Sequence, residues 1–272
     1  MKKVSFCIVL YKQSPTLLER AIRSCLLYQG EKRIYLIDNS DTDALSCLQQ
    51  IDPSIEYVWL EKNLGFGKAN NIAIQRASEW GSQFHFLVNP DIFYTEDVAE
   101  SMVAYMESNP AVGGMMPQIL NPDGSIQYLP KLIPSLWKLF WRKCPWPRSV
   151  HSKMLQAFEM RGMKQDKVYE ILHITGCFCV YRTDALVRIG GFDDRFFMYF
   201  EDTDLCRSVH ATHHTLYYPF VHVFHDYGNG AAKEARLFWH FTVSAIKYFR
   251  KWGLIDLKGH RLNQEILKQL DD

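Results

Sequence analysis

Residues 84–91 read FHFLVNPD, a mainly apolar run that contains one histidine, His85, and ends in a polar turn. A mainly apolar run of this length is typical of a strand that is buried on both faces of a parallel sheet. The apolar runs of the first half occupy residues 4–10, 33–37, 55–60 and 84–88, and helix-type segments at 15–28, 41–51 and 65–80 separate them. This alternation predicts an α/β fold with a doubly wound, mostly parallel sheet.

The second half of the chain alternates less regularly. We expect helices at residues 95–108, 183–189, 232–252 and 257–270, strands at 112–116, 171–181 and 216–224, and a turn at 121–124. Residues 1–120 and 121–230 are interpreted as two halves of one domain, and residues 231–272 as a C-terminal helical segment.

Composition excludes several classes of protein. The 31 basic and 30 acidic residues leave a net charge of +1, which argues against a nucleic-acid-binding protein. The seven cysteines form no CxxC pair, so neither a zinc ribbon nor a disulfide framework is indicated, and scattered thiols fit a reducing cytoplasm. No apolar run reaches the roughly 18 residues of a transmembrane helix. We therefore expect a soluble or peripheral protein.

Polar residues follow four of the predicted strands. Tyr11, Asp38, Asn63 and Asp91 each stand just after an apolar run. Doubly wound sheets bind their ligands outside the carboxyl ends of the strands. We therefore expect these residues to line a ligand site at one edge of the sheet.

The turn Asn89-Pro90-Asp91 contains a candidate metal ligand. Divalent cations such as Mg²⁺ prefer hard oxygen ligands. Asp91 can therefore bind Mg²⁺ or Mn²⁺ directly, while Asn89 can bind a ligand or a water molecule. On the motif alone, a plain Asx-Pro turn is an equal alternative.

Three acids in FFMYFEDTDLC, namely Glu201, Asp202 and Asp204, stand at the start of a predicted helix. Acids at this position are also favoured by the helix dipole, so a capping cluster is the alternative. The preceding aromatic run favours a pocket wall, where burial raises the pKa of a carboxyl group. We predict that Asp202 is a general base, that Glu201 contacts either an acceptor hydroxyl or a residue that supports one, and that Asp204 is structural.

His222 and His225 stand at the end of a predicted strand, so strand alternation places them on opposite faces. His225 is nearer the strand end and is the predicted ligand of a metal or a diphosphate. A histidine satisfied within the core is the alternative interpretation.

Residues 61–71, EKNLGFGKANN, form a glycine-rich lead into a helix. They match neither the P-loop nor the dinucleotide fingerprint. The free amides near Gly67 and the ammonium group of Lys68 are nevertheless expected to approach a diphosphate.

Taken in order, these motifs resemble the family 2 glycosyltransferases of the GT-A fold, which is Rossmann-like, and especially the bacterial rhamnosyltransferase-like branch. The resemblance covers residues 4–252. It is carried by CIVLYK, LIDNS, EKNLGFGKANN, FLVNPD at the family's D-x-D, and FFMYFEDTDLCRS at its E-D-x-D-L-x-x-R motif.

The resemblance implies a role for each matching residue. Donor binding would involve Tyr11 and Asp38 at the nucleotide, and Asn63, Gly65 and Asn70 at its pocket. Asp91 would bind the metal, Asp202 would act as the base, and His225 would occupy the position of the family's late histidine. The family inverts the anomeric centre by one direct displacement. Residues 1–120 would then bind the nucleotide sugar, and residues 121–230 the acceptor.

Two departures from the family pattern affect the donor side. Leu10 and Lys12 replace the usual Thr and Asn, and Asn89 replaces the first acid of D-x-D. Fewer charged ligands therefore face the metal. The branch suggests dTDP-rhamnose as donor, with UDP-hexoses also open.

The expected acceptor is a surface polysaccharide of the O-antigen or capsule type, or a polyisoprenoid-linked glycan. The segments LWKLFWRKCPWPR (136–148) and IKYFRKWG (246–253) mix aromatic and basic residues, which is typical of peripheral membrane contact. We expect a cytoplasmic protein at the inner face of the membrane. An acceptor wall or a homodimer contact is an equal alternative for these segments.

Two other functions are weighed against the transferase. A nucleotidyltransferase would need a glycine- and basic-rich signature after the first strand, which residues 11–15 do not supply. A sugar-nucleotide-binding module without catalysis is disfavoured because Asp91 and Asp202 are both present.

Overall fold

The computed structural model describes residues 2–136, 155–226 and 234–270. The elements of the first half are β1 (Val4–Leu10), α1 (Pro15–Leu26), β2 (Lys32–Asp38), η1 (Ser46–Ile51), β3 (Ile55–Trp59), α2 (Phe66–Trp80), β4 (Phe84–Val88), β5 (Ile92–Phe93), α3 (Val98–Ser108) and β6 (Val112–Leu120). Those of the second half are β7 (Tyr169–Glu170), β8 (Phe178–Arg182), α6 (Thr183–Ile189), α7 (Glu201–His210), β9 (His214–His225), α8 (Glu234–Trp252) and α9 (Leu257–Lys268).

Within the described residues, nine strands form one sheet in the order β3-β2-β1-β4-β8-β6-β9-β5, with β7 paired to β9. Strands β1 to β4 are mutually parallel, whereas β8 runs antiparallel to both β4 and β6. Strand β9 returns parallel to β6. The predicted α/β class with a mostly parallel central sheet is confirmed, and the same sheet runs through both predicted halves of the domain.

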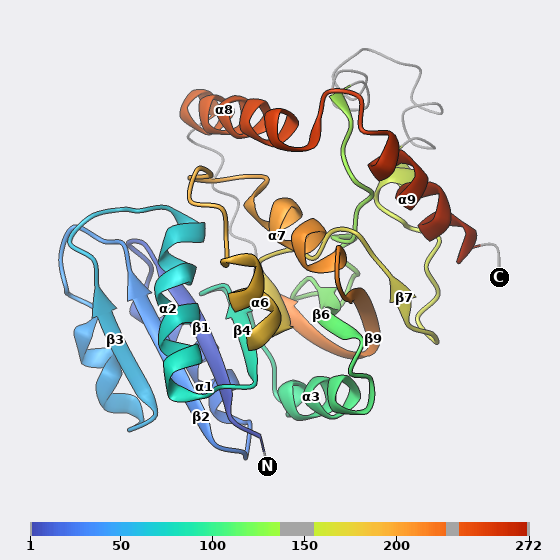
Figure 1. Cartoon of the computed structure of the whole chain (residues 1–272). Helices are drawn as coiled ribbons and strands as arrows, with labels where there is room; N and C mark the ends of the chain where they lie inside the picture. The colour runs from blue at the N-terminus through green and yellow to red at the C-terminus, as the bar shows by residue number, and fades with distance from the viewer. Residues whose placement is uncertain (1, 137–154, 227–233, 271–272) are drawn as a thin grey trace.

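Alternate residues of the central strands pack against helices on opposite faces of the sheet (Figure 1). Phe6 and Ile8 of β1 lie in one core cluster with Ile22 of α1. Cys7, the intervening residue, lies in a second cluster with Ala73 of α2. Because both faces are covered, the strands contain mainly apolar runs rather than an alternating pattern. The carboxyl ends of β1 to β4 remain available for a site.

Helix α8 and the loop before α7 pack together near the sheet's carboxyl edge (Figure 1). Phe196, Phe200, Tyr248 and Phe249 form a separate core cluster between them. The C-terminal segment is therefore packed against the helix that carries the predicted acids.

Two predicted elements differ from the structure. The helix expected over 41–51 is only the 3₁₀ helix η1, because the polar residues before it are held in a loop by hydrogen bonds such as Ser40 N to Asp38 Oδ1. The strand expected over 171–181 is wrong for residues 171–177, which are irregular. Ile171 and Leu172 are apolar because they are buried in the core, although they belong to no strand.

Candidate active site

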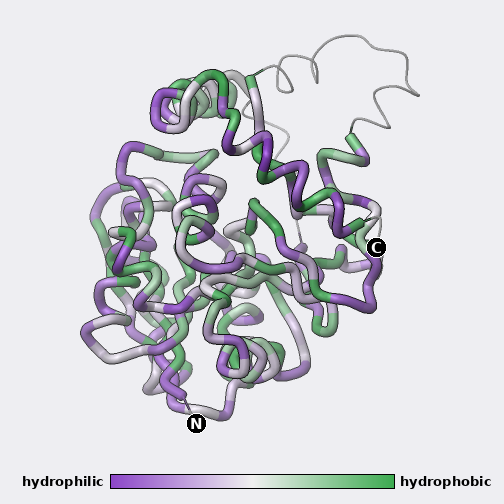
Figure 2. Tube along the Cα trace, turned by 45° about the vertical axis from the view of Figure 1, so that its right-hand side comes forward, coloured by the Kyte–Doolittle hydropathy of each residue, from purple (hydrophilic) through white to green (hydrophobic). Residues whose placement is uncertain are grey.

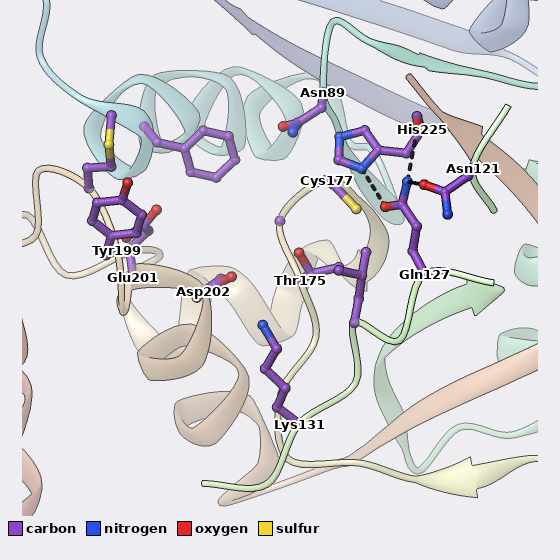
Figure 3. Close-up of a pocket in the computed structure, with 14 residues that line it drawn as sticks. Asn89, Asn121, Gln127, Lys131, Thr175, Cys177, Tyr199, Glu201, Asp202 and His225 are labelled. Carbon is purple, nitrogen blue, oxygen red and sulfur yellow. Dashed lines mark hydrogen bonds between the residues drawn. The ribbon is translucent and has the colours of Figure 1, made fainter. Parts of the chain in front are cut away.

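A cleft of about 620 Å³ lies beyond the carboxyl ends of β4 and β9 (Figure 3). Four predicted site residues line it: Asn89, Glu201, Asp202 and His225. Additional polar lining comes from Asn121, Gln127, Lys131 and Thr175. Segments more than 100 residues apart in sequence therefore meet at one cleft.

Strand pairing sets Asp91 beside His225. Ile92 of β5 pairs with His225 of β9, and the backbone N–H of Asp226 donates to the Asp91 carbonyl at 2.9 Å. The Asp91 Oδ1 and His225 Nε2 atoms consequently lie 3.3 Å apart. His225 is buried, whereas His222 lies on the outer surface. Of the two histidines, the structure places His225 at the cleft.

The Asp91–His225 pair has the chemistry of two ligands of one divalent cation. Asp91 Oδ1 is buried and has no hydrogen-bond partner among the described residues. Ligand atoms about 2.0–2.2 Å from a cation lie roughly 3 Å from each other when they are adjacent, close to the observed spacing. No group of three or more His, Cys, Asp or Glu side chains suited to a metal is found in residues 2–136, 155–226 and 234–270. The described protein thus offers two side-chain ligands.

The acids of α7 follow a strained backbone segment. Tyr199 and Phe200 have φ angles of 69° and 66°, in the left-handed region that costs a non-glycine residue about 1–3 kcal/mol. Helix α8 holds this segment: the Phe200 ring packs on Tyr248, and the Ser244 hydroxyl donates to the Met198 carbonyl at 2.7 Å. Glu201 and Asp202, the first residues of α7, follow this segment directly and line the cleft.

Burial, and to a smaller extent the charge of the neighbouring Asp202, raise the pKa of Glu201 to about 8. Glu201 is therefore mainly protonated at neutral pH. Sequence reasoning expected the raised pKa at the general base, whereas the structure gives it to the neighbouring Glu201. Asp202 is a quarter exposed, and its Oδ1 accepts the backbone N–H of Thr203 at 2.7 Å.

A second cavity of about 220 Å³ adjoins the cleft. The two cavities share Lys131, Thr175, Tyr199, Glu201 and Asp202. The second cavity is further lined by Leu132, Pro134, Phe158, His173, Phe200, Thr203 and Phe241. Asp202 therefore stands on the wall between an aromatic cavity and the cavity that contains His225.

The remaining charged residues of α7 face away from the cleft. Asp204 is buried and accepts hydrogen bonds from Lys251 Nζ and Trp252 Nε1, both at 2.7 Å. Arg207 pairs with Asp256 at 2.7 Å, so these residues anchor α7 to the C-terminal helices. The structural role expected for Asp204 agrees with these contacts.

The predicted nucleotide-side residues do not line this cleft, and Asp38 is fully buried. Its carboxylate accepts hydrogen bonds from Tyr57 Oη at 2.7 Å and Ser40 N at 2.8 Å. Asp38 therefore has no exposed oxygen with which to make the direct contact with a base or ribose that was expected of it. Asp38 instead holds the loop after β2, while Tyr11 at the end of β1 is exposed.

The glycine-rich segment before α2 is used mainly for packing. A Cβ at Gly65, whose φ is +85°, would lie 2.5 Å from the Phe197 carbonyl oxygen, and one at Gly67 would lie 3.1 Å from Phe192 Cβ. Asn70 is buried and donates to the Phe66 carbonyl. The two glycines allow the loop before α7 to pack closely, and all three residues are buried and present little surface to a donor.

Asn63 and Lys68 remain accessible near the same helix start. Asn63 is exposed, and its Oδ1 accepts the Gly65 N–H at 2.9 Å. Lys68 is half-buried in the first turn of α2. Of the glycine-rich segment, these two side chains have the exposure that donor binding requires.

Several cleft residues were not predicted from the sequence. Gln127 and Asn121 flank the recognised turn at 121–124, and Gln127 Oε1 lies 2.9 Å from His225 Nδ1. His173, whose pKa is lowered by burial, lies 3.8 Å from Asp202 Oδ2. The available signal was that His173 is a polar residue inside the apolar run 171–181.

Comparison with known proteins decides the family. The model of glycosyl transferase family 2 matches residues 5–190, more than half of the chain. The chain belongs to glycosyl transferase family 2. The match ends before α7, so it includes Asn89 and Asp91 but not the acids at 201 and 202.

This family 2 glycosyltransferase has rhamnosyltransferases among its relatives. It is 26% identical over 245 residues to the N-acetylglucosaminyl-diphospho-decaprenol L-rhamnosyltransferase of Mycobacterium tuberculosis, covering 83% of this chain and 76% of that protein. It is 25% identical over 229 residues to the rhamnosyltransferase WbbL of Escherichia coli strain K12, covering 80% and 82%. These two relatives confirm the predicted resemblance to the rhamnosyltransferase-like branch.

Similarity to solved structures confirms the GT-A fold. The structure of GalNAc-T7 with UDP, GalNAc and Mn²⁺ superposes with a TM-score of 0.62 at 16% identity, over 83% of this chain and 44% of that chain. The glycosyltransferase therefore has the fold that the sequence motifs implied.

Proposed function

We propose that the protein transfers a sugar, with inversion, from a nucleoside-diphosphate donor to a hydroxyl of a lipid-linked or surface glycan. The observation that carries the proposal is the position of Asp202 on the wall between two cavities, one of which reaches His225. A donor and an acceptor in the two cavities would meet at this carboxylate.

The donor would lie across the carboxyl edge of the sheet. The exposed Tyr11, Asn63 and Lys68 are the proposed contacts at the nucleotide, with Asp38 supporting the loop beneath them. The diphosphate would extend to Asn89 and Asp91. The donor is dTDP-rhamnose, as the relatives' names suggest, or a UDP-hexose.

Asp91 and His225 would hold a divalent cation, Mg²⁺ or Mn²⁺, together with donor oxygens. When bound, the cation balances the negative charge that collects on the leaving diphosphate. The structurally similar GalNAc-T7 was solved with Mn²⁺, which supports a divalent cation in general. Because Asn89 is uncharged, Asp91 is expected to bind metal tightly only with the nucleotide sugar present.

In this proposal, Asp202 accepts the proton of the acceptor hydroxyl as the oxygen attacks the anomeric carbon. The bond from that carbon to the diphosphate oxygen breaks on the opposite side, which inverts the configuration. Glu201, protonated at neutral pH, adds no second negative charge beside the base and can donate a hydrogen bond to the acceptor.

The acceptor would enter through the aromatic cavity that contains His173 and Phe241. Aromatic faces suit a sugar ring, and the half-buried Lys131 at the shared wall suits an anionic group of the acceptor. The Mycobacterium tuberculosis relative is named for a diphospho-decaprenol acceptor. A polyisoprenoid-linked acceptor is therefore the class we propose.

A membrane contact is proposed for the outer face of α8 and the turn after it. Of the predicted segment 246–253, Tyr248 and Phe249 are buried, so that part of the membrane prediction is wrong. Ile246 of that segment is exposed, and further exposed apolar side chains are those of Trp239, Leu254, Ile255 and Leu257. Figure 2 shows hydrophobic and hydrophilic residues alternating along α8. Residues 137–148 lie outside the described residues.

Charge supports a lipid surface as the occupant of this face. Residues 239–262 include five Lys or Arg residues and one acid, Asp256, which is paired with Arg207. Anionic lipid headgroups attract such a surface. No helix among residues 2–136, 155–226 and 234–270 has the length and apolarity needed to cross a bilayer.

Vesicle co-sedimentation tests the membrane contact. Ile255→Ser should reduce binding to phosphatidylglycerol vesicles at least several-fold, because it removes an apolar side chain that is 84% exposed. The control Val187→Ser changes a half-exposed residue on α6 and should have no effect. Equal binding of both variants, or dimer dissociation caused by Ile255→Ser, would overturn the membrane proposal in favour of a self-contact.

Product analysis tests the proposed reaction. The protein is incubated with Mn²⁺, a polyisoprenoid-diphosphate glycan and either dTDP-rhamnose or a UDP-hexose, and the products are resolved by NMR. We expect a nucleoside diphosphate and a glycosidic bond of inverted configuration. Formation of a sugar 1-phosphate and a nucleoside triphosphate from added pyrophosphate would show a nucleotidyltransferase. Binding without any product would show a module that has lost catalysis.

A further inference from the structure

We propose that Gln127 is a positioning residue that holds His225 in the tautomer able to bind a cation beside Asp91. The inference rests on the proposed cation site and assigns a function to the hairpin after β6. The Gln127 amide contacts His225 twice (Figure 3). Its Nε2 donates to the His225 carbonyl at 3.0 Å, and its Oε1 lies 2.9 Å from His225 Nδ1.

The orientation of the Gln127 amide is fixed by its partners. A backbone carbonyl can only accept, so the amide nitrogen must face the His225 carbonyl. The amide oxygen, which can only accept, then faces His225 Nδ1. The imidazole must therefore carry its hydrogen on Nδ1, and in the neutral ring the lone pair is left on Nε2.

The turn at 121–124 supports the same orientation through a second route. Ser125 Oγ donates to Asp123 Oδ1 at 2.6 Å, so its oxygen is free to accept from Asn121 Nδ2 at 2.8 Å. Asn121 must then direct its Oδ1 to Gln127 Nε2, at 2.6 Å. A carboxylate at the turn thereby sets the direction of every hydrogen bond up to His225.

The Nδ1–H tautomer directs the Nε2 lone pair of His225 towards Asp91. The Nε2 lone pair and Asp91 Oδ1 are both electron-rich and lie 3.3 Å apart. Two such atoms repel each other unless a cation lies between them, so the hydrogen-bonded hairpin prepares the pair for a cation. Groups that orient a metal-binding histidine in this way typically change metal affinity by about 10–100-fold when they are removed.

The tautomer can be measured without any metal. In the metal-free protein labelled with ¹⁵N-histidine, at pH 8, where an unperturbed imidazole is neutral, NMR distinguishes Nδ1–H from Nε2–H. His225 is assigned by the loss of its signals in His225→Gln. We expect the Nδ1–H form in the wild type and a shift towards Nε2–H in Gln127→Met. An Nε2–H form in the wild type would overturn the inference.

The second readout is Mn²⁺ affinity, followed by the electron paramagnetic resonance of free Mn²⁺. Gln127→Met should weaken it about 10–100-fold. Gln118→Met is the matched control, since Gln118 lies on β6 and bonds Gln165 at 2.8 Å.

The outcomes separate this inference from the proposed function. If the wild type binds Mn²⁺ and Gln127→Met binds it equally well, the positioning role is wrong while the cation site stands. If the wild type binds no Mn²⁺, the cation site is wrong and the inference fails with it. If metal-free Gln127→Met unfolds at the same temperature as the wild type, its loss of Mn²⁺ affinity does not result from a loss of folding.

Discussion

Two acids of the candidate site have opposite surroundings: Asp202 lines the cleft, whereas Asp91 lies beside the cleft residue His225. Asp91 is held by paired strands beside an imidazole, with Oδ1 directed at His225 Nε2. Asp202 follows two strained residues and stands beside Glu201, whose pKa is raised to about 8. The first arrangement suits a cation that stays in place, and the second suits a proton that moves. This difference is the basis for proposing that donor binding and base catalysis depend on different acids.

Removing the Asp202 carboxylate, the proposed general base, should have the largest effect on activity. Asp202→Asn should lower kcat by about 10²–10⁴, because a general base contributes that factor, while the donor Kd stays unchanged. Asp184→Asn, an exposed acid on α6, is the control. Steady-state kinetics with separately measured donor binding provides the test. Near-normal turnover in Asp202→Asn would remove Asp202 as the base.

The anchoring of α7 gives the next largest effect. Arg207→Met should lower the free energy of unfolding by about 3 kcal/mol, since it leaves Asp256, which is 13% exposed, and the buried Tyr248 without their cationic partner. It should also reduce kcat more than donor affinity, because α7 carries Asp202. The control Arg195→Met removes a pair with Asp193 in which the arginine is 58% exposed, against 4% for Arg207, and should change little. Urea unfolding and kinetics measure both effects, and equal stability of the two variants would contradict the anchor.

A smaller effect is expected from Glu201→Gln, and it depends on pH. The folded pKa of about 8 lies above the ordinary value of 4.5. The stability that comes from the protonated, buried form is therefore full below about pH 4.5 and is lost as the pH rises to about 8. Gln cannot ionise, so the variant should gain roughly 2 °C or more in Tm over the wild type between pH 5 and pH 8. Parallel Tm curves would show that Glu201 has an ordinary pKa.

Much of the fold could be predicted from the sequence, because mainly apolar runs and glycine-rich helix starts are local signals. The runs at 4–10 and 84–88 became strands with those bounds. The run at 171–181 failed because burial beneath a cleft selects apolar residues as strongly as a strand does. Periodicity alone does not distinguish the two.

The site was predicted in part, for reasons that are also physical. Strand alternation and position in the chain identified His225 and Asp91 as neighbours of a ligand edge. The sequence did not reveal that Asp38 is buried, because burial depends on Tyr57 from another strand. Gln127 was missed because a glutamine after a turn has no local signature, and its contact with His225 spans 98 residues.

The most direct test of the central claim is thermal stability in the presence of nucleotide sugars, with and without Mn²⁺. A donor at about 100 times its Kd should stabilise the protein by roughly 2.7 kcal/mol. We expect dTDP-rhamnose or a UDP-hexose to raise Tm strongly only when Mn²⁺ is present. Asp91→Asn should lose this joint effect, and the neighbouring Asp226→Asn should keep it. Shifts that are equal with and without Mn²⁺, or no shift with any pyrimidine nucleotide, would contradict the account.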